Sequence, residues 1–125
     1  QAGETAPHTA TVQPQGIYHL NQPTVILTSG FTASAAEVFA MTMRQFPQVT
    51  LMGTATAGAF SDVASFTLPN GWELGLSHQH YRDAAGVSYE GIGIAPDIAI
   101  PVDVTAARSG RDTTLQEAIA RLSVQ

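Results

Sequence analysis

The fold is decided by residues 24–52, which read TVILTSGFTASAAEVFAMTMRQFPQVTLM. Residues 24–28 form a continuous β-branched apolar run, which is typical of a strand buried on both faces. Residues 34–46 carry helix formers with an apolar stripe at helical spacing, and Pro47 ends this helix. Residues 49–52 are a second apolar strand. Strand, helix and strand within about 30 residues predict a βαβ unit with parallel strands and a right-handed connection.

The sequence around this unit predicts fewer regular elements. Residues 1–22 are polar and contain prolines, so we expect an entry segment with at most one short strand, near Ile17–Leu20. Residues 63–68 and 72–77 flank Pro69-Asn70-Gly71. Asn-Gly between two alternating runs is a strong signal for a β-hairpin.

The C-terminal part predicts one more short strand, at residues 96–102, and a closing helix at residues 115–123. Thr114 and Glu117 have the spacing of a capping box in front of that helix. The chain is therefore an α/β protein. A doubly wound sheet usually has more βαβ units, so we expect an incomplete part of a larger domain.

Composition excludes several classes of function. The 125 residues fit one domain, and acids outnumber bases 10 to 5 for a formal charge of -5. There is no basic stretch and no apolar run of about 18 residues, so we expect neither a nucleic-acid partner nor a membrane span. Cysteine and lysine are both absent, so neither a cysteine nucleophile nor a lysine base can come from this chain.

Ser34 is the first candidate for chemistry. It stands at the start of a helix, just past the carboxyl end of a buried strand, where open α/β sheets place reactive groups. The N–H of Ala35 beside it can bind an oxyanion. Ser34-Ala35-Ala36-Glu37 is also a capping box, and the local pattern favours that reading. The two roles can coexist.

No histidine is convincingly paired with Ser34 as its base. His8 lies in the entry segment, and His19 precedes the first strong strand. His78 and His80 alternate in an expected strand, so they share one face and could be half of a metal site. No third ligand has diagnostic spacing, so we interpret them as a solvated face and expect no metal and no cofactor.

Two loops could border a cleft. Residues 54–59 have no Gly-Lys-Ser/Thr, so we expect no nucleotide-binding role there, and we interpret Gly58 and Ala59 as cleft-lining residues. Glu90 is followed by a glycine-rich run. A lone acid in a loop is usually solvated, but backbone N–H groups could hold this one where it orients a base.

Three segments in order, residues 32–37, 53–58 and 90–97, together resemble the carboxy-terminal processing (tail-specific) serine protease family. The matching stretch runs from about Thr24 to Val102. The resemblance implies that residues 23–125 are the C-terminal part of a catalytic domain with a fold related to the Clp protease and crotonase group.

The resemblance also implies roles for single residues. Ser34 matches the nucleophile, and the N–H of Ala35 matches half of the oxyanion hole. The lysine-using branch of the family has its base at the position that is Ala59 here. The chain therefore looks closer to the branch of tricorn core proteases and interphotoreceptor retinoid-binding protein. In the tricorn-like enzymes a histidine from the preceding half of the domain is the base, and Glu90 matches the glutamate that supports it.

Two hypotheses for function follow. The first is a serine peptidase that acts on polypeptides, inactive as an isolated chain, with an apolar patch where the missing N-terminal half packs and a tendency to self-associate. The second is a non-catalytic module that binds a peptide or an apolar ligand on the same scaffold. Family habit implies a periplasmic or secreted protein.

Overall fold

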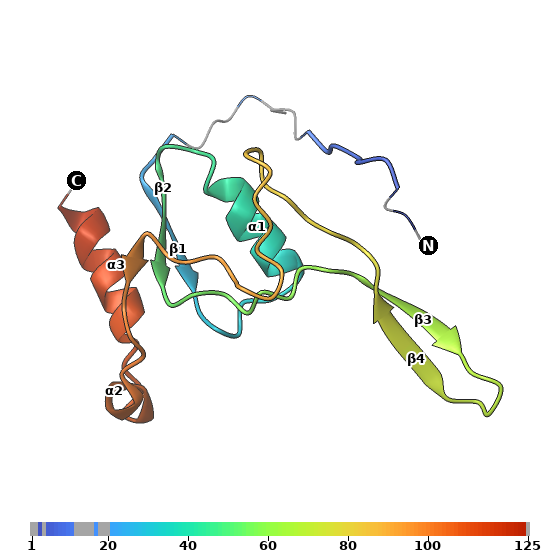
Figure 1. Cartoon of the computed structure of the whole chain (residues 1–125). Coiled ribbons are helices and arrows are strands. Elements are labelled where there is room, and N and C mark those ends of the chain that lie inside the picture. The colour runs from blue at the N-terminus through green and yellow to red at the C-terminus, as the bar shows by residue number, and fades with distance from the viewer. Residues whose placement is uncertain (1–2, 4, 12–16, 18–20, 125) are drawn as a thin grey trace.

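The computed structural model describes residues 3, 5–11, 17 and 21–124. Most of the strand expected near Ile17–Leu20 lies outside the described residues, as does His19. The elements in Figure 1 follow the chain as β1 (Thr24–Thr28), α1 (Ala35–Met43), β2 (Val49–Gly53), β3 (Val63–Thr67), β4 (Glu73–Ser77), β5 (Ile98–Ala99), α2 (Val104–Arg108) and α3 (Thr113–Ser123).

The βαβ unit predicted from the sequence is confirmed. The three-stranded sheet has the order β1-β2-β5, and both pairs of neighbours are parallel. The register of the first pair runs from Thr24 opposite Val49 to Thr28 opposite Gly53. Helix α1 is shorter than expected because the chain leaves it at Arg44 and turns ahead of the proline that precedes β2.

Strand β1 is less buried than its apolar sequence predicts. Of its five residues only Thr28 is buried, and Leu27 is 39% exposed. The prediction of a strand buried on both faces is therefore wrong for β1 within the described residues. The reason is its place at the edge of the sheet, where a strand has a neighbour on one side only. The central strand β2 is the well-buried one.

The core lies between α1 and β2. Ala40 and Met41 of α1 pack with Leu51 of β2, and Phe60 joins them from the following loop. Side chains alternate along a strand, so Leu51 and its buried neighbour Met52 face opposite sides of the sheet. Helix α3 contacts β1 and β2, and Figure 1 shows α1 and α3 on opposite sides of this strand pair. The carboxyl ends of β1 and β2 lead into the loops that carry the candidate site.

The hairpin of β3 and β4 projects away from this body (Figure 1). Its strands are antiparallel, as predicted, and the register pairs Ala64 with Leu76 and Phe66 with Leu74. Cross-strand partners share a face, so one face of the hairpin is apolar. The side chains of Phe66, Leu74 and Leu76 are exposed there. Self-association through such surface stays a prediction.

The C-terminal helices both begin at an aspartate. The Asp103 side chain accepts a hydrogen bond from Ala106 N at 2.9 Å and caps α2, a helix that the sequence pattern did not predict. The Asp112 side chain accepts one from Leu115 N at 2.9 Å and caps α3. Thr114 lies inside α3, so the capping box assigned to it is wrong: aspartate is as good an N-cap as threonine, and it comes earlier in the chain.

No helix in the described part of the chain is long and apolar enough to cross a membrane.

Candidate active site

Ser34 has a strained backbone directly in front of α1. Its φ of 55° makes it the only non-glycine residue with a positive φ among the residues that the structure describes. Its N–H donates to Ala59 O at 2.9 Å, and its carbonyl accepts from the N–H groups of Glu37 and Val38. A sparsely populated backbone conformation costs on the order of 1–3 kcal/mol and persists where the surrounding contacts hold it, often at active sites.

The side chain of Ser34 makes no capping hydrogen bond to α1. An N-cap side chain reaches the N–H groups of the first turn from an extended backbone, and the positive φ of Ser34 takes its hydroxyl out of that geometry. The capping box predicted for Ser34 and Glu37 is therefore wrong. Ser34 is exposed, and it lies at the positive end of the α1 dipole.

Ala35 is the first residue of α1. The first N–H groups of a helix have no partner inside the helix. No described residue accepts a hydrogen bond from Ala35 N–H. The exposed Ser34 thus stands beside a donor that is free within the described part of the chain, and binding of an oxyanion by this donor stays a prediction.

Glu37 is fully buried, with 0% of its surface exposed. Its Oε1 accepts hydrogen bonds from Thr56 Oγ1 at 2.5 Å and Gly58 N at 2.7 Å, and its Oε2 accepts from Ala59 N at 2.8 Å. The sequence pattern predicts that Glu37 belongs to a capping box, and it does not predict these three hydrogen bonds. A signal was present in the loop Thr56–Ala59, whose small residues leave backbone N–H groups open to a carboxylate.

Glu90 holds the next part of the same loop. Its Oε2 accepts from Phe60 N at 3.1 Å and Ser61 N at 2.9 Å. Backbone N–H groups thus hold the carboxylate, as the sequence suggested, although the donors come from the loop after β2. Gly91 N also donates to Gly58 O at 2.7 Å, which ties the two loops together. Glu90 is half-buried, and a role toward a base stays a prediction.

Two glycines let these loops meet. Gly58 has a φ of +74°, and a Cβ there would lie 2.7 Å from the backbone N atoms of Ile92 and Gly93. Gly93 has a φ of +80°, and a Cβ there would lie 2.1 Å from Thr56 O. Only glycine combines the left-handed backbone with this approach. Gly58 is buried and Ala59 exposed; that they line a substrate cleft stays a prediction.

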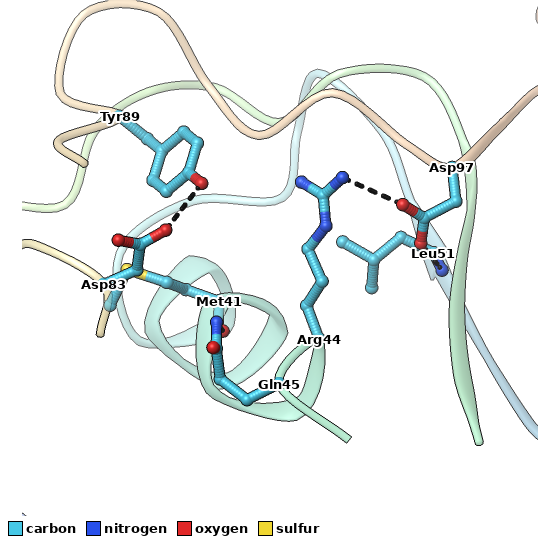
Figure 2. A network of polar contacts seen from close by, with 7 residues as sticks. All are labelled: Met41, Arg44, Gln45, Leu51, Asp83, Tyr89 and Asp97. Carbon is cyan, nitrogen blue, oxygen red and sulfur yellow. Dashed lines mark hydrogen bonds and ion pairs between the residues drawn. The ribbon is translucent and has the colours of Figure 1, made fainter. Parts of the chain in front are cut away.

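An aspartate organises the segment before Glu90. Asp83 Oδ1 accepts from Ala85 N and Val87 N, each at 2.9 Å. Its Oδ2 accepts from Tyr89 OH at 2.9 Å, the contact that Figure 2 shows. The hydrogen bond from Val87 N, followed by that from Tyr89, lowers the pKa of Asp83. The same contact with Asp83 raises the pKa of Tyr89. The ring of Tyr89 stacks on Phe60 with the centroids 6.3 Å apart.

Arg44 joins the end of α1 to the sheet. Figure 2 shows its guanidinium reaching Asp97, with 2.8 Å between Nη2 and Oδ1. Asp97 Oδ2 accepts in turn from Leu51 N at 2.8 Å. Asp97 thus stands directly before β5, and its carboxylate ties the start of that strand to β2. Both ends of α1 are therefore fixed relative to the loops of the candidate site.

The histidines lie apart from this arrangement. β4 ends at Ser77, so the strand predicted to carry His78 and His80 is wrong: His78 turns back to Asp62, with 3.1 Å between its Nδ1 and Asp62 O. None of the described histidines is hydrogen-bonded to Ser34 or Glu90. No group of three described His, Cys, Asp or Glu residues could hold a metal ion.

Comparison with known proteins places this arrangement in context. A family model described as peptidase family S41 matches residues 2–100. The carboxy-terminal-processing protease of Bartonella bacilliformis is 32% identical over 100 residues, which cover 80% of this chain and 23% of that protein. A crystal structure of a candidate peptidase from Parabacteroides merdae is similar with a TM-score of 0.73 and 36% identity, over 82% of this chain and 32% of that one.

The tricorn protease shares the fold, with a TM-score of 0.65 at 24% identity over 78% of this chain and 10% of its own. The resemblance inferred from the three sequence segments is confirmed by these similarities, and so is the α/β class with its βαβ core. The chain spans no more than about a third of the length of any of these three relatives: 23%, 32% and 10%.

Gly93→Ala is expected to destabilise the protein more than Gly86→Ala. Both glycines have a φ of +80°, so each replacement costs about 1–2 kcal/mol for the left-handed backbone. Nothing lies within 4 Å of a Cβ on Gly86, whereas one on Gly93 overlaps Thr56 O, and overpacking costs about 1–3 kcal/mol more. Urea unfolding of the two variants measures the difference. Equal losses would contradict the close approach of the loops.

Asp83→Asn is expected to lower the free energy of unfolding at neutral pH, with a loss that disappears in acid. The folded state lowers the pKa of Asp83, so its stabilisation is complete above the ordinary value of 3.8 and is lost as the pH falls through the folded pKa. Denaturant unfolding of both proteins from neutral pH to about pH 3 measures the gap between their midpoints. If the gap between the two unfolding midpoints does not change with pH, Asp83 stabilises the fold independently of its charge, which would contradict this prediction.

Proposed function

The chain belongs to peptidase family S41, and from this premise we propose that it is part of a serine peptidase in which Ser34 attacks peptide bonds of polypeptides. One observation carries the proposal most directly. The fold holds Ser34 at a φ of 55°, which a serine adopts only at a cost, and its side chain is not spent on capping the helix. The N–H of Ala35 beside it has no acceptor among the described residues, which supports a role as an oxyanion donor.

The chemistry follows from this placement. Ser34 Oγ attacks the carbonyl carbon while its proton passes to a base, and the carbonyl oxygen becomes an oxyanion that Ala35 N–H stabilises. The C–N bond then breaks, the base returns its proton to the leaving amine, and an acyl-enzyme remains. Water hydrolyses the acyl group by the same sequence of proton transfers and frees Ser34.

The base comes from outside the described residues in this proposal. Lysine is absent, and Ala59 occupies the position where one branch of the family has it. A histidine from another part of the complete gene product would take the proton. Glu90 would orient it: Oε2 of Glu90 is engaged by two N–H groups, while Oε1 has no donor among the described residues. A periplasmic or secreted location belongs to the same proposal.

A binding role without catalysis has one observation in its favour. An open groove of about 450 Å³ lies at the carboxyl ends of β1 and β2, and Leu27, Ile100 and Val102 are among its lining residues. Grooves of this size hold small ligands. Ser34 is not among the lining residues, so an apolar ligand bound there would need no nucleophile.

Reaction with a fluorophosphonate probe tests the peptidase proposal. The complete gene product is expected to become labelled at Ser34, and Ser34→Ala is expected to remove the label, whereas Ser65→Ala on the exposed hairpin should keep it. The isolated 125-residue chain should stay unlabelled because it lacks the base. Labelling of the isolated chain would contradict an external base. No labelling of either protein would favour the binding role.

A further inference from the structure

We propose that Glu37 is a positioning residue, which holds Ser34 and Glu90 at a fixed spacing through the loop between them. This inference rests on the proposed function, because it assigns Glu37 a purpose toward the nucleophile. Glu37 itself touches no reacting atom in the proposed mechanism. Its carboxylate acts through the Thr56 hydroxyl and the backbone N–H groups of Gly58 and Ala59.

Burial of the Glu37 carboxylate costs free energy, which contacts inside the protein must offset. A carboxylate removed from water needs full compensation. The one ion pair among the described residues joins Arg44 and Asp97, so no described cation neutralises Glu37. Its compensation comes from three hydrogen bonds and from its place in the first turn of α1, at the positive end of the helix dipole. An apolar residue at position 37 would leave the Thr56 hydroxyl and the N–H groups of Gly58 and Ala59 without this acceptor, so the carboxylate and the loop donors depend on one another.

Ala59 links the Glu37 carboxylate to the proposed nucleophile Ser34. Ala59 donates its N–H to Glu37 Oε2 at 2.8 Å, and its carbonyl accepts from Ser34 N at 2.9 Å. Glu37 lies one helical turn after Ser34, so the three residues form a closed ring of contacts. This ring opposes relaxation of Ser34 toward an ordinary φ and so keeps its side chain off the helix end.

The backbone of residues 58–61 links the Glu37 carboxylate to the Glu90 carboxylate. Four consecutive backbone N–H groups, from Gly58 to Ser61, donate to carboxylates: the first two to Glu37, the last two to Glu90. Thr56 adds a second link, since its Oγ1 donates to Glu37 and accepts from Ile94 N at 2.7 Å. The position of one carboxylate therefore determines where the donors of the other lie.

Glu37→Gln tests the inference in the complete gene product. The amide presents one NH₂ group where Glu37 accepts from backbone N–H groups or a hydroxyl, so at least one donor loses its acceptor. Thr56→Val removes the hydroxyl at nearly constant shape, and Thr56→Ser keeps it. Glu117→Gln, on the exposed face of α3, makes the same chemical change without burial and serves as the matched control.

The readout is the rate of fluorophosphonate labelling at Ser34, at a temperature where circular dichroism shows every variant to be folded. We expect Glu37→Gln to lower the limiting rate constant roughly 10- to 100-fold, because a displacement near 1 Å has that effect. The probe concentration for half-saturation should not change. Thr56→Val should also react slowly, whereas Thr56→Ser and Glu117→Gln should keep the wild-type rate.

A wild-type labelling rate in folded Glu37→Gln would overturn the inference, and so would equal slowing in Thr56→Ser and Thr56→Val. If the wild-type protein itself does not react, the proposed function fails, and backbone amide exchange then decides about Glu37. Faster amide exchange at residues 58–61 in Glu37→Gln than in Glu117→Gln would support the role of Glu37 in holding this loop. Equal exchange would overturn it.

Discussion

The hydrogen bonds between the Glu37 carboxylate and the loop after β2 are the contacts on which the rest of the site depends. Residues 54–59 of this loop are small and have little packing surface of their own, so the shape of this stretch depends on its hydrogen bonds to Glu37. The glycines at positions 58 and 93 let the neighbouring loop come within reach. The buried carboxylate, the small side chains and the left-handed glycines therefore act together. They hold Ser34 in a backbone conformation with positive φ that serine disfavours.

Much of the fold could be predicted from local sequence. Continuous apolar runs on either side of a helix pattern identify parallel strands, and Asn70-Gly71 identifies the hairpin, since these signals depend on residues close in the chain. The burial of β1 could not be predicted, because it depends on whether a further strand covers its outer edge. The start of α3 was missed because Asp112 and Thr114 are both good caps, and only the backbone decides between them.

The candidate site also contains residues that the sequence identifies and one residue that it does not. Ser34 and Glu90 could be picked out because three sequence segments in order resemble one family, although the local pattern alone favours a helix cap for Ser34 and a solvated acid for Glu90. Glu37 could not: three residues after a serine it has the spacing of a capping box, and its actual partners lie 19 to 22 positions further along the chain. Local propensity failed here because a tertiary contact outcompeted it, and such conflicts gather at functional sites.

The most direct measurement is a crystal structure of the complete gene product after reaction with a fluorophosphonate. We expect phosphorus bonded to Ser34 Oγ, a phosphoryl oxygen within hydrogen-bond distance of Ala35 N, and a positive φ retained at Ser34. A histidine from outside these 125 residues should lie between the adduct and Glu90. An adduct on another residue, or a Ser34 whose hydroxyl caps α1 in the unreacted protein, would contradict the role of Ser34 as the nucleophile.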